Sequence, residues 1–169
     1  MPSTATVTAG GRRDHERVVA RYRQAYPQLH FTIERRSVRV ALEAIVTGGT
    51  RRVVVHGGFL RHAALGAAAL AVALAHEVAH HDPSGPMRAD GLCREQWADY
   101  WGVRAVLPRV WGAAAPAIAV AGVAQLKRYW RIDTSGPSPP PLTVDYPSPA
   151  CRVATLEAAI DGRPCPRPY

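Results

Sequence analysis

A run of alanine and leucine that ends in titratable residues constrains this 169-residue chain more than any other feature. Residues 63–82 read AALGAAALAVALAHEVAHHD, so an apolar segment closes with three histidines and two acids. Such a segment predicts one long buried helix over 60–82, ended by Pro83. Imidazole and carboxylate groups are costly on a buried helix unless they have partners. The segment therefore carries either a metal site or a polar helix end that happens to be rich in histidine.

The cluster contains the pattern H-E-x-x-H at His76, Glu77 and His80. Residues four apart lie one turn apart on the same face of a helix, so both imidazoles can reach one ion. Glu77 lies about 100° round the helix and can point at a water on that ion rather than at the ion itself. The apolar surroundings make surface histidines the weaker alternative, and the pattern predicts a metal site.

A catalytic zinc usually takes a third protein ligand and leaves its fourth position open for water. Pro83 and Pro86 stand where the metzincin pattern needs Gly and His, which excludes that class. Downstream, Glu95 and Asp99 lie four residues apart on a predicted helix over 94–106 and would face the first helix. Glu95 can take the third ligand position, and Asp99 can accept the free ring N–H of a liganding histidine.

The two motifs together resemble a family. HEVAHH followed by EQWADYWG is similar to the H-E-x-x-H…E-x-x-x-D signature of gluzincin zinc metallopeptidases, and most of all to their HtpX-like and CAAX-prenyl-protease branch. The Gly-rich RRVVVHGGFLRH before the motif and a Pro-x-x-x-x-Arg segment that begins at Pro147 add to the likeness, which touches residues 51–107 and 143–160. The chain would be a minimal soluble relative without inserted membrane helices.

The resemblance implies a zincin-like fold and a zinc ion bound by His76, His80 and Glu95. It also implies Glu77 as the general base and Asp99 as the acid that orients a ligand.

Three further residues are candidates for stabilising a transition state. Tyr146 stands where that branch has a histidine before the proline, and a phenol can donate a hydrogen bond to an oxyanion. His56 and Arg152 are the other two, and Arg152 would lie just behind the ligands.

The order of the expected elements indicates an α+β fold, in which a small sheet of three or slightly more strands packs on the active-site helix and a mainly helical C-terminal half follows. We expect a single domain over 12–160 between flexible tails at 1–11 and 161–169. The expected strands are 29–34, 38–46 and 51–56, and the expected helices are 14–26, 60–82, 94–106 (stopped by Pro108), 113–130 and 150–160.

Composition and charge limit the classes of binding partner and the cellular compartment that we expect for this chain. The net charge is +8, and residues 12–61 hold eleven Arg against four acids, a local excess of +7 that attracts anionic partners or simply forms a solvated face. No aromatic and basic signature of a nucleic-acid module accompanies the arginines. The sequence shows no signal peptide and no run of about 18 apolar residues. We therefore expect a cytoplasmic protein without a membrane span, and reduced thiols at its three cysteines.

The sequence thus favours a zinc metallopeptidase that acts on a peptide or protein substrate, acidic if the arginines take part. Strand 51–56 is expected at a sheet edge, where an extended peptide can pair with it. Two alternatives stay open, namely a zincin-fold zinc enzyme acting on a non-peptide or modified-peptide substrate in a biosynthetic pathway, and a non-enzymatic basic binding module with a structural metal. The oligomeric state is left open.

Overall fold

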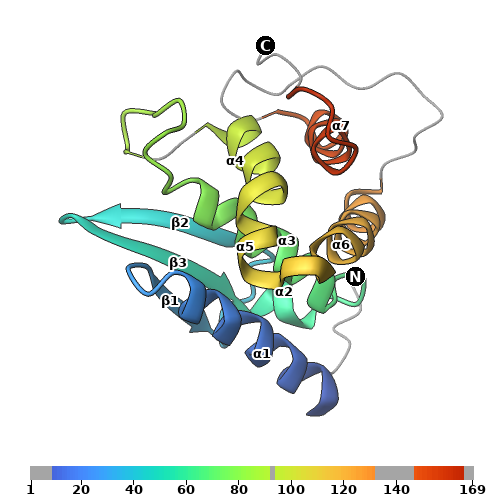
Figure 1. The fold of residues 1–169 in the computed structure, drawn as a ribbon. Helices are drawn as coiled ribbons and strands as arrows, with labels where there is room; N and C mark the ends of the chain where they lie inside the picture. Colours follow the sequence, from blue (N-terminus) through green and yellow to red (C-terminus); the bar gives the residue numbers. More distant parts are fainter. Residues whose placement is uncertain (1–8, 92–93, 132–146, 166–169) are drawn as a thin grey trace.

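The computed structural model describes residues 9–91, 94–131 and 147–165, which form an α+β fold with a small mixed sheet and a helical C-terminal half (Figure 1). The elements in chain order are α1 (Ala9–Ala25), β1 (His30–Glu34), β2 (Leu42–Thr47), β3 (Thr50–His56), α2 (Gly57–Arg61), α3 (Ala67–Ala79), α4 (Glu95–Trp101), the π-helical segment η1 (Gly102–Val106), α5 (Leu107–Trp111), the 3-10 turn η2 (Gly112–Ala114), α6 (Ala115–Trp130) and α7 (Pro149–Ile160).

Helix α3 is the centre of the fold. Ten of its thirteen residues are buried, and α1, α4, η1 and α6 pack against it. The Tyr22 hydroxyl on α1 donates to the Ala71 carbonyl oxygen on α3 at 2.6 Å. Helix α1 begins at Ala9, five residues before the start expected from the sequence, so residues 9–11 belong to a helix rather than to a flexible tail. The Ala-rich run thus forms a core helix, as its composition predicts.

The sheet has the order β1-β3-β2, in which β1 runs parallel to β3 and β2 runs antiparallel to it. Strand β3 is therefore the central strand, and the prediction of strand 51–56 as a sheet edge is wrong. The physical reason lies in the three consecutive valines Val53, Val54 and Val55, all of them buried, which suit a strand flanked on both sides. Among the described residues, β1 and β2 are the edge strands of the sheet.

The single helix predicted over 60–82 is two helices, α2 and α3, separated at residues 62–66. Gly66 has an extended backbone at the start of α3. The Gln125 side-chain oxygen on α6 accepts hydrogen bonds from the backbone N–H groups of Gly66 at 2.9 Å and Ala69 at 3.0 Å. Gln125 thus satisfies N–H groups at the start of α3 although it lies at least 56 residues further along the chain. Local periodicity cannot reveal such a cap.

Pro108 does not stop the helix that begins with α4, in contrast to the prediction. The wider π-helical turn η1 precedes the proline, and the Leu107 N–H donates to the Gly102 carbonyl oxygen, five residues back. A proline ring clashes with the carbonyl oxygen four residues earlier in an α-helix, and a π turn relieves that clash. The chain turns only at Gly112, where φ is +54°.

The helical run Glu95–Trp130 is long and apolar enough, by length and composition alone, to cross a membrane. One such run is weak evidence for a span, because core helices pass the same test of length and composition. Only 33% of its most apolar window is buried here, so burial does not decide between the two. The turn at Gly112 also divides the run, so that α4–η1–α5 and α6 point in different directions (Figure 1).

Candidate metal centre

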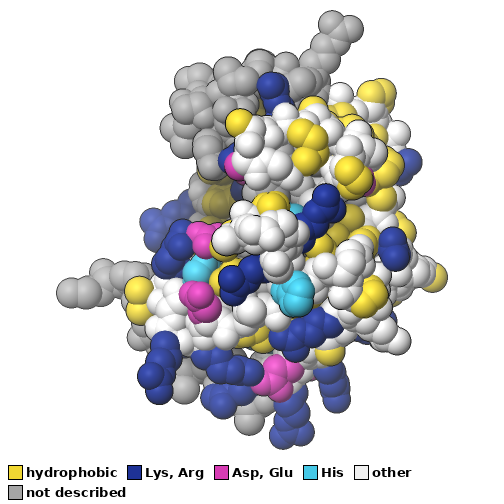
Figure 2. All heavy atoms as spheres, turned by 90° about the vertical axis from the view of Figure 1, so that its left-hand side faces the viewer, with side chains coloured by type: hydrophobic (Ala, Val, Ile, Leu, Met, Phe, Trp, Pro, Cys, Tyr) yellow, Lys and Arg dark blue, Asp and Glu magenta, His cyan; other side chains and the backbone are white. Residues whose placement is uncertain are grey.

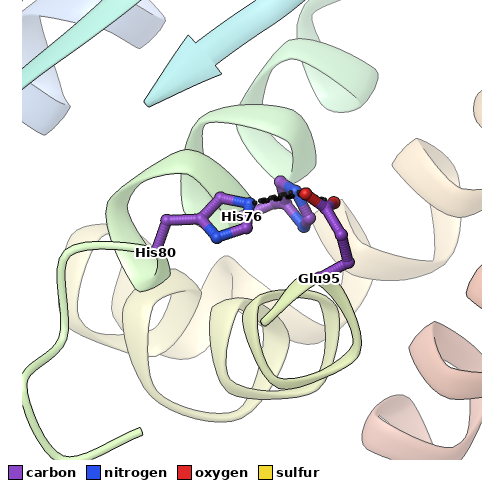
Figure 3. A group of neighbouring side chains, drawn as sticks. All are labelled: His76, His80 and Glu95. Carbon is purple, nitrogen blue, oxygen red and sulfur yellow. Dashed lines mark hydrogen bonds and ion pairs between the residues drawn. The ribbon is translucent and has the colours of Figure 1, made fainter. Parts of the chain in front are cut away.

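Three side chains from two helices converge at the C-terminal end of α3 (Figure 3). The Nε2 atoms of His76 and His80 lie 2.9 Å apart, and the two rings are nearly perpendicular. The Glu95 carboxylate on α4 approaches both rings, with Oε2 3.2 Å from Nε2 of His76 and Oε1 3.4 Å from Nε2 of His80. The predicted third ligand therefore meets the predicted pair.

These residues fit a metal ion by donor type and spacing. One ligand atom from each of His76, His80 and Glu95 lies within 4.8 Å of the others, and all three side chains are at least 87% buried. Two ligands at about 2.0–2.1 Å on a tetrahedral ion lie roughly 3.3 Å apart, close to the separations found here. Two imidazoles and a carboxylate are a donor set that suits zinc. The group could hold such an ion.

Asp99 and Arg152 both contact His76, one of the three candidate ligands. The Asp99 Oδ1 atom lies 2.7 Å from Nδ1 of His76, and the Asp99 side chain is 1% exposed. Arg152 on α7 donates two hydrogen bonds to this carboxylate, from Nε to Oδ2 at 2.8 Å and from Nη2 to Oδ1 at 2.7 Å. The Arg152 guanidinium also lies over the ring of Trp130, 5.2 Å from its centroid. Two helices thus fix the carboxylate that orients His76.

The charges in this cluster depend on one another. Burial disfavours the charged form of His76, but the Asp99 charge and hydrogen bonds to Asp99 and Glu95 outweigh it and raise the pKa of His76 to about 10. Burial likewise raises the pKa of Glu95, but the two histidines outweigh it and hold the pKa well below its usual range. Burial also opposes the charge of Asp99, yet Arg152 and His76 lower its pKa. When Nδ1–H of His76 donates to Asp99, Nε2 is left for a metal ion, which competes there with a proton.

Glu77 lies beside the ligands rather than among them. Its Oε1 is 4.0 Å from Nε2 of His76, and its side chain is 11% exposed. Both residues line a pocket of about 230 Å³, whose other walls are mainly apolar side chains from the β2 end of the sheet, α2, α3, α6 and α7: Val40, Leu42, Phe59, Val72, Leu126, Tyr129, Trp130 and Leu156. A carboxylate here can exchange a proton with a small molecule held at the three ligands.

Close packing of α3 against η1 sets the distance between the two ligand-bearing helices. A Cβ atom on Gly102 would lie 3.0 Å from the carbonyl carbon and oxygen of Ala75 and from the backbone nitrogen of His76. A side chain at this position would push the two backbones apart. The glycine that follows EQWADYW therefore has a direct bearing on the site.

Six of the predicted site residues come together in the structure, namely His76, Glu77, His80, Glu95, Asp99 and Arg152. Tyr146 lies outside the described residues. His56 has another place, at the end of β3, where its ring nitrogens lie 3.1 Å from Glu34 and 3.2 Å from Glu43. It does not line the pocket beside His76.

The sequence did not predict that Arg88 belongs to the site. Arg88 Nη1, from the loop after α3, lies 3.5 Å from Glu95 Oε1. The loop sequence around Arg88 contains Gly, Pro and Asp and carries no periodic signal. Only the folded loop brings this cation to the third ligand.

No family model, no curated protein and no solved structure matches this chain. We therefore infer its function from the residues of the site and from the motif resemblance.

Proposed function

We propose that this protein is a zinc-dependent metallopeptidase with a zincin-like fold, related to the HtpX-like and CAAX-prenyl-protease branch of the gluzincins. One observation carries the proposal. The Glu95 carboxylate reaches the two histidines of H-E-x-x-H from a separate helix, and Asp99, one turn further on, meets the back of His76. A helix end with surface histidines would not need a buried acid on either side of the same imidazole.

In this proposal His76, His80 and Glu95 hold the zinc ion. When bound, zinc makes a water molecule more acidic and polarises the carbonyl group of the substrate. Glu77 then takes the proton of the attacking water at its carboxylate and returns it to the leaving amine. Asp99 holds the proton on Nδ1 of His76 throughout, which keeps Nε2 directed at the ion. Arg152 keeps Asp99 ionised and in place.

An extended peptide is the substrate shape that suits the surroundings of Glu77. Strand β2 is an edge strand of the sheet that the structure describes. Its first residue, Leu42, and the preceding Ala41 line the same pocket as His76 and Glu77. A peptide that adds to this edge would run past the metal ligands. Pairing at β2 replaces the pairing at β3 that was expected from the sequence.

Substitution of the general base tests the proposal most directly. Glu77→Gln should retain zinc and lose cleavage of a peptide library by about 10²–10⁴-fold, because the proton acceptor is gone while the ligands remain. His80→Ala should lose the zinc as well. Glu157→Gln, which removes a partly exposed carboxylate paired with Lys127, is the matched control and should change neither property.

The outcomes separate the alternatives. Stoichiometric zinc without cleavage of any library peptide would favour an enzyme with a non-peptide or modified-peptide substrate, or a structural metal in a binding module. Full activity of Glu77→Gln would contradict hydrolysis assisted by this carboxylate. Faster cleavage of acidic peptides than of neutral ones would support a role for the arginines in substrate binding. The cytoplasmic location expected from the sequence stays a prediction.

A further inference from the structure

A second pocket lies on the other side of the α3 end from the metal site. Its volume is about 370 Å³, and it is bounded by the turn between α1 and β1, the start of β3, the last turn of α3, η1 and α5. Its apolar walls include Leu29, Val78 and Trp101, and Tyr26 adds a second aromatic ring. None of the metal ligands lines it.

The charged groups of this pocket are Arg51, Arg109 and Asp82, a formal sum of +1. Six other arginines pair with carboxylates in the described part of the chain: Arg17, Arg35, Arg39, Arg88, Arg152 and Arg163. No such ion pair joins Arg51 or Arg109 to a described carboxylate. Two cations without carboxylate partners therefore face one cavity.

Both cations are held in place by contacts that leave donors free. Arg51 is half-buried and donates from Nη1 to the His81 carbonyl oxygen at 2.9 Å. Arg109 lies over the ring of Tyr26, with Cζ 4.6 Å from the ring centroid. A guanidinium group has five N–H donors in a planar fork, so each side chain has donors left for an oxyanion.

The buried residue His81 also lines this pocket. His81 is 4% exposed, and its Nε2 lies 3.0 Å from the Arg52 carbonyl oxygen. Because a carbonyl oxygen accepts only, Nε2 carries the proton and Nδ1 is an acceptor in the neutral ring. Nδ1 has no hydrogen-bond partner among the described residues. Such an acceptor can take a hydrogen bond from a water molecule or from a donor group of a ligand, but not from an oxyanion. An anionic group in this pocket would therefore meet the two arginines rather than His81.

We propose that this pocket binds a small organic oxyanion, a carboxylate or phosphate on an aromatic or aliphatic body. Arg51 and Arg109 meet the anionic group, and Trp101, Leu29 and Val78 cover the apolar body. The site is separate from the metal centre, so its test does not depend on whether the protein is a peptidase.

Tryptophan fluorescence gives a direct readout, because Trp101 lines the pocket and its ring stacks on that of Trp97 with centroids 5.3 Å apart. The probes are benzoate, phenylphosphate, inorganic phosphate and the neutral benzamide. We expect saturable binding of benzoate or phenylphosphate with a dissociation constant on the order of 1 mM, as suits so small a ligand. Benzamide and inorganic phosphate should bind at least about tenfold more weakly, because benzamide lacks the negative charge and inorganic phosphate lacks the apolar body.

Substitution then locates the binding. Arg109→Gln should raise the dissociation constant of the preferred probe by about tenfold or more, as expected for the loss of a charged hydrogen bond. Arg104→Gln is the matched control, since Arg104 is exposed on η1 and does not line the pocket. The proposal is overturned if neither organic anion binds, if benzamide or inorganic phosphate binds as well as they do, or if the two variants bind equally. Benzoate and phenylphosphate compared with each other identify the anionic group.

Discussion

The Oδ1 atom of Asp99 lies 2.7 Å from Nδ1 of His76, on the side of the imidazole ring opposite to the atom that faces Glu95. This contact joins α4 to α3 and brings Arg152 of α7 into the same cluster. The position of His76 therefore depends on three helices. A substitution at Asp99 or Arg152 should affect His76 as well.

Asp99→Asn tests the orienting role of the carboxylate. Zinc affinity should fall by about 10–100-fold, because an amide is a weaker acceptor for the His76 N–H and can present the wrong group to it. Competition with a chelator of known affinity measures the change. Asp161→Asn, at an exposed carboxylate paired with Arg163, should leave the affinity unchanged. An unchanged affinity in Asp99→Asn would show that the contact has no part in metal binding.

Arg152→Ala should destabilise the fold by roughly 3–5 kcal/mol, because it leaves the buried Asp99 charge without its main partner. The double variant Arg152→Ala with Asp99→Asn should be less destabilised than the sum of the two single variants, since the uncompensated charge is then gone. Urea denaturation of all four proteins measures the coupling. Simple additivity would mean that the two side chains act independently.

Gly102→Ala should lower zinc affinity and stability together, because the added Cβ lies 3.0 Å from the Ala75 and His76 backbones. Gly122→Ala is a matched comparison. A Cβ there would meet the Ala68 carbonyl oxygen and a Val72 methyl group at 2.5 Å, at the contact between α3 and α6. It should cost stability, by about 1–3 kcal/mol, yet leave zinc affinity nearly unchanged. Equal losses of affinity in both variants would contradict a specific role for Gly102.

Removal of the proposed zinc ion should lower the melting temperature. A ligand present at about 100 times its dissociation constant stabilises the folded state by about 2.7 kcal/mol, which corresponds to a shift of roughly 5–10 °C for a chain of this size. Thermal unfolding with zinc and with a chelator measures the shift. His80→Ala should have the same melting temperature in both solutions, and a persisting shift in this variant would place the ion elsewhere.

The pH dependence of stability should reflect His15, which is buried on α1. Burial lowers its pKa, against a smaller opposing effect of Asp14. The unfolded chain therefore takes up a proton at this site before the folded chain does, and the free energy of unfolding falls as the pH drops through about 6.5. His15→Leu should show a weaker decline between about pH 7.5 and 5.5 in urea denaturation. An identical decline would exclude His15 as a contributor.

The sequence by itself determined the local geometry of the site. H-E-x-x-H on a helix puts two imidazoles on one face because the helical period is close to four residues, and E-x-x-x-D does the same for Glu95 and Asp99. The apolar composition of the run before His76 likewise predicted a core helix, since such a segment is stable only when it is buried. These features depend on residues within a turn or two of one another.

Only the tertiary structure decided which segments meet. The central place of β3, the start of α3 under the Gln125 cap and the bidentate contact from Arg152 to Asp99, 53 residues apart, all depend on contacts between distant segments. Periodicity reports that a face is buried but not what buries it, because many partners can remove the same apolar area from water. The pocket lined by Arg51 and Arg109 also depends on distant contacts, since its walls come from four separate stretches of the chain.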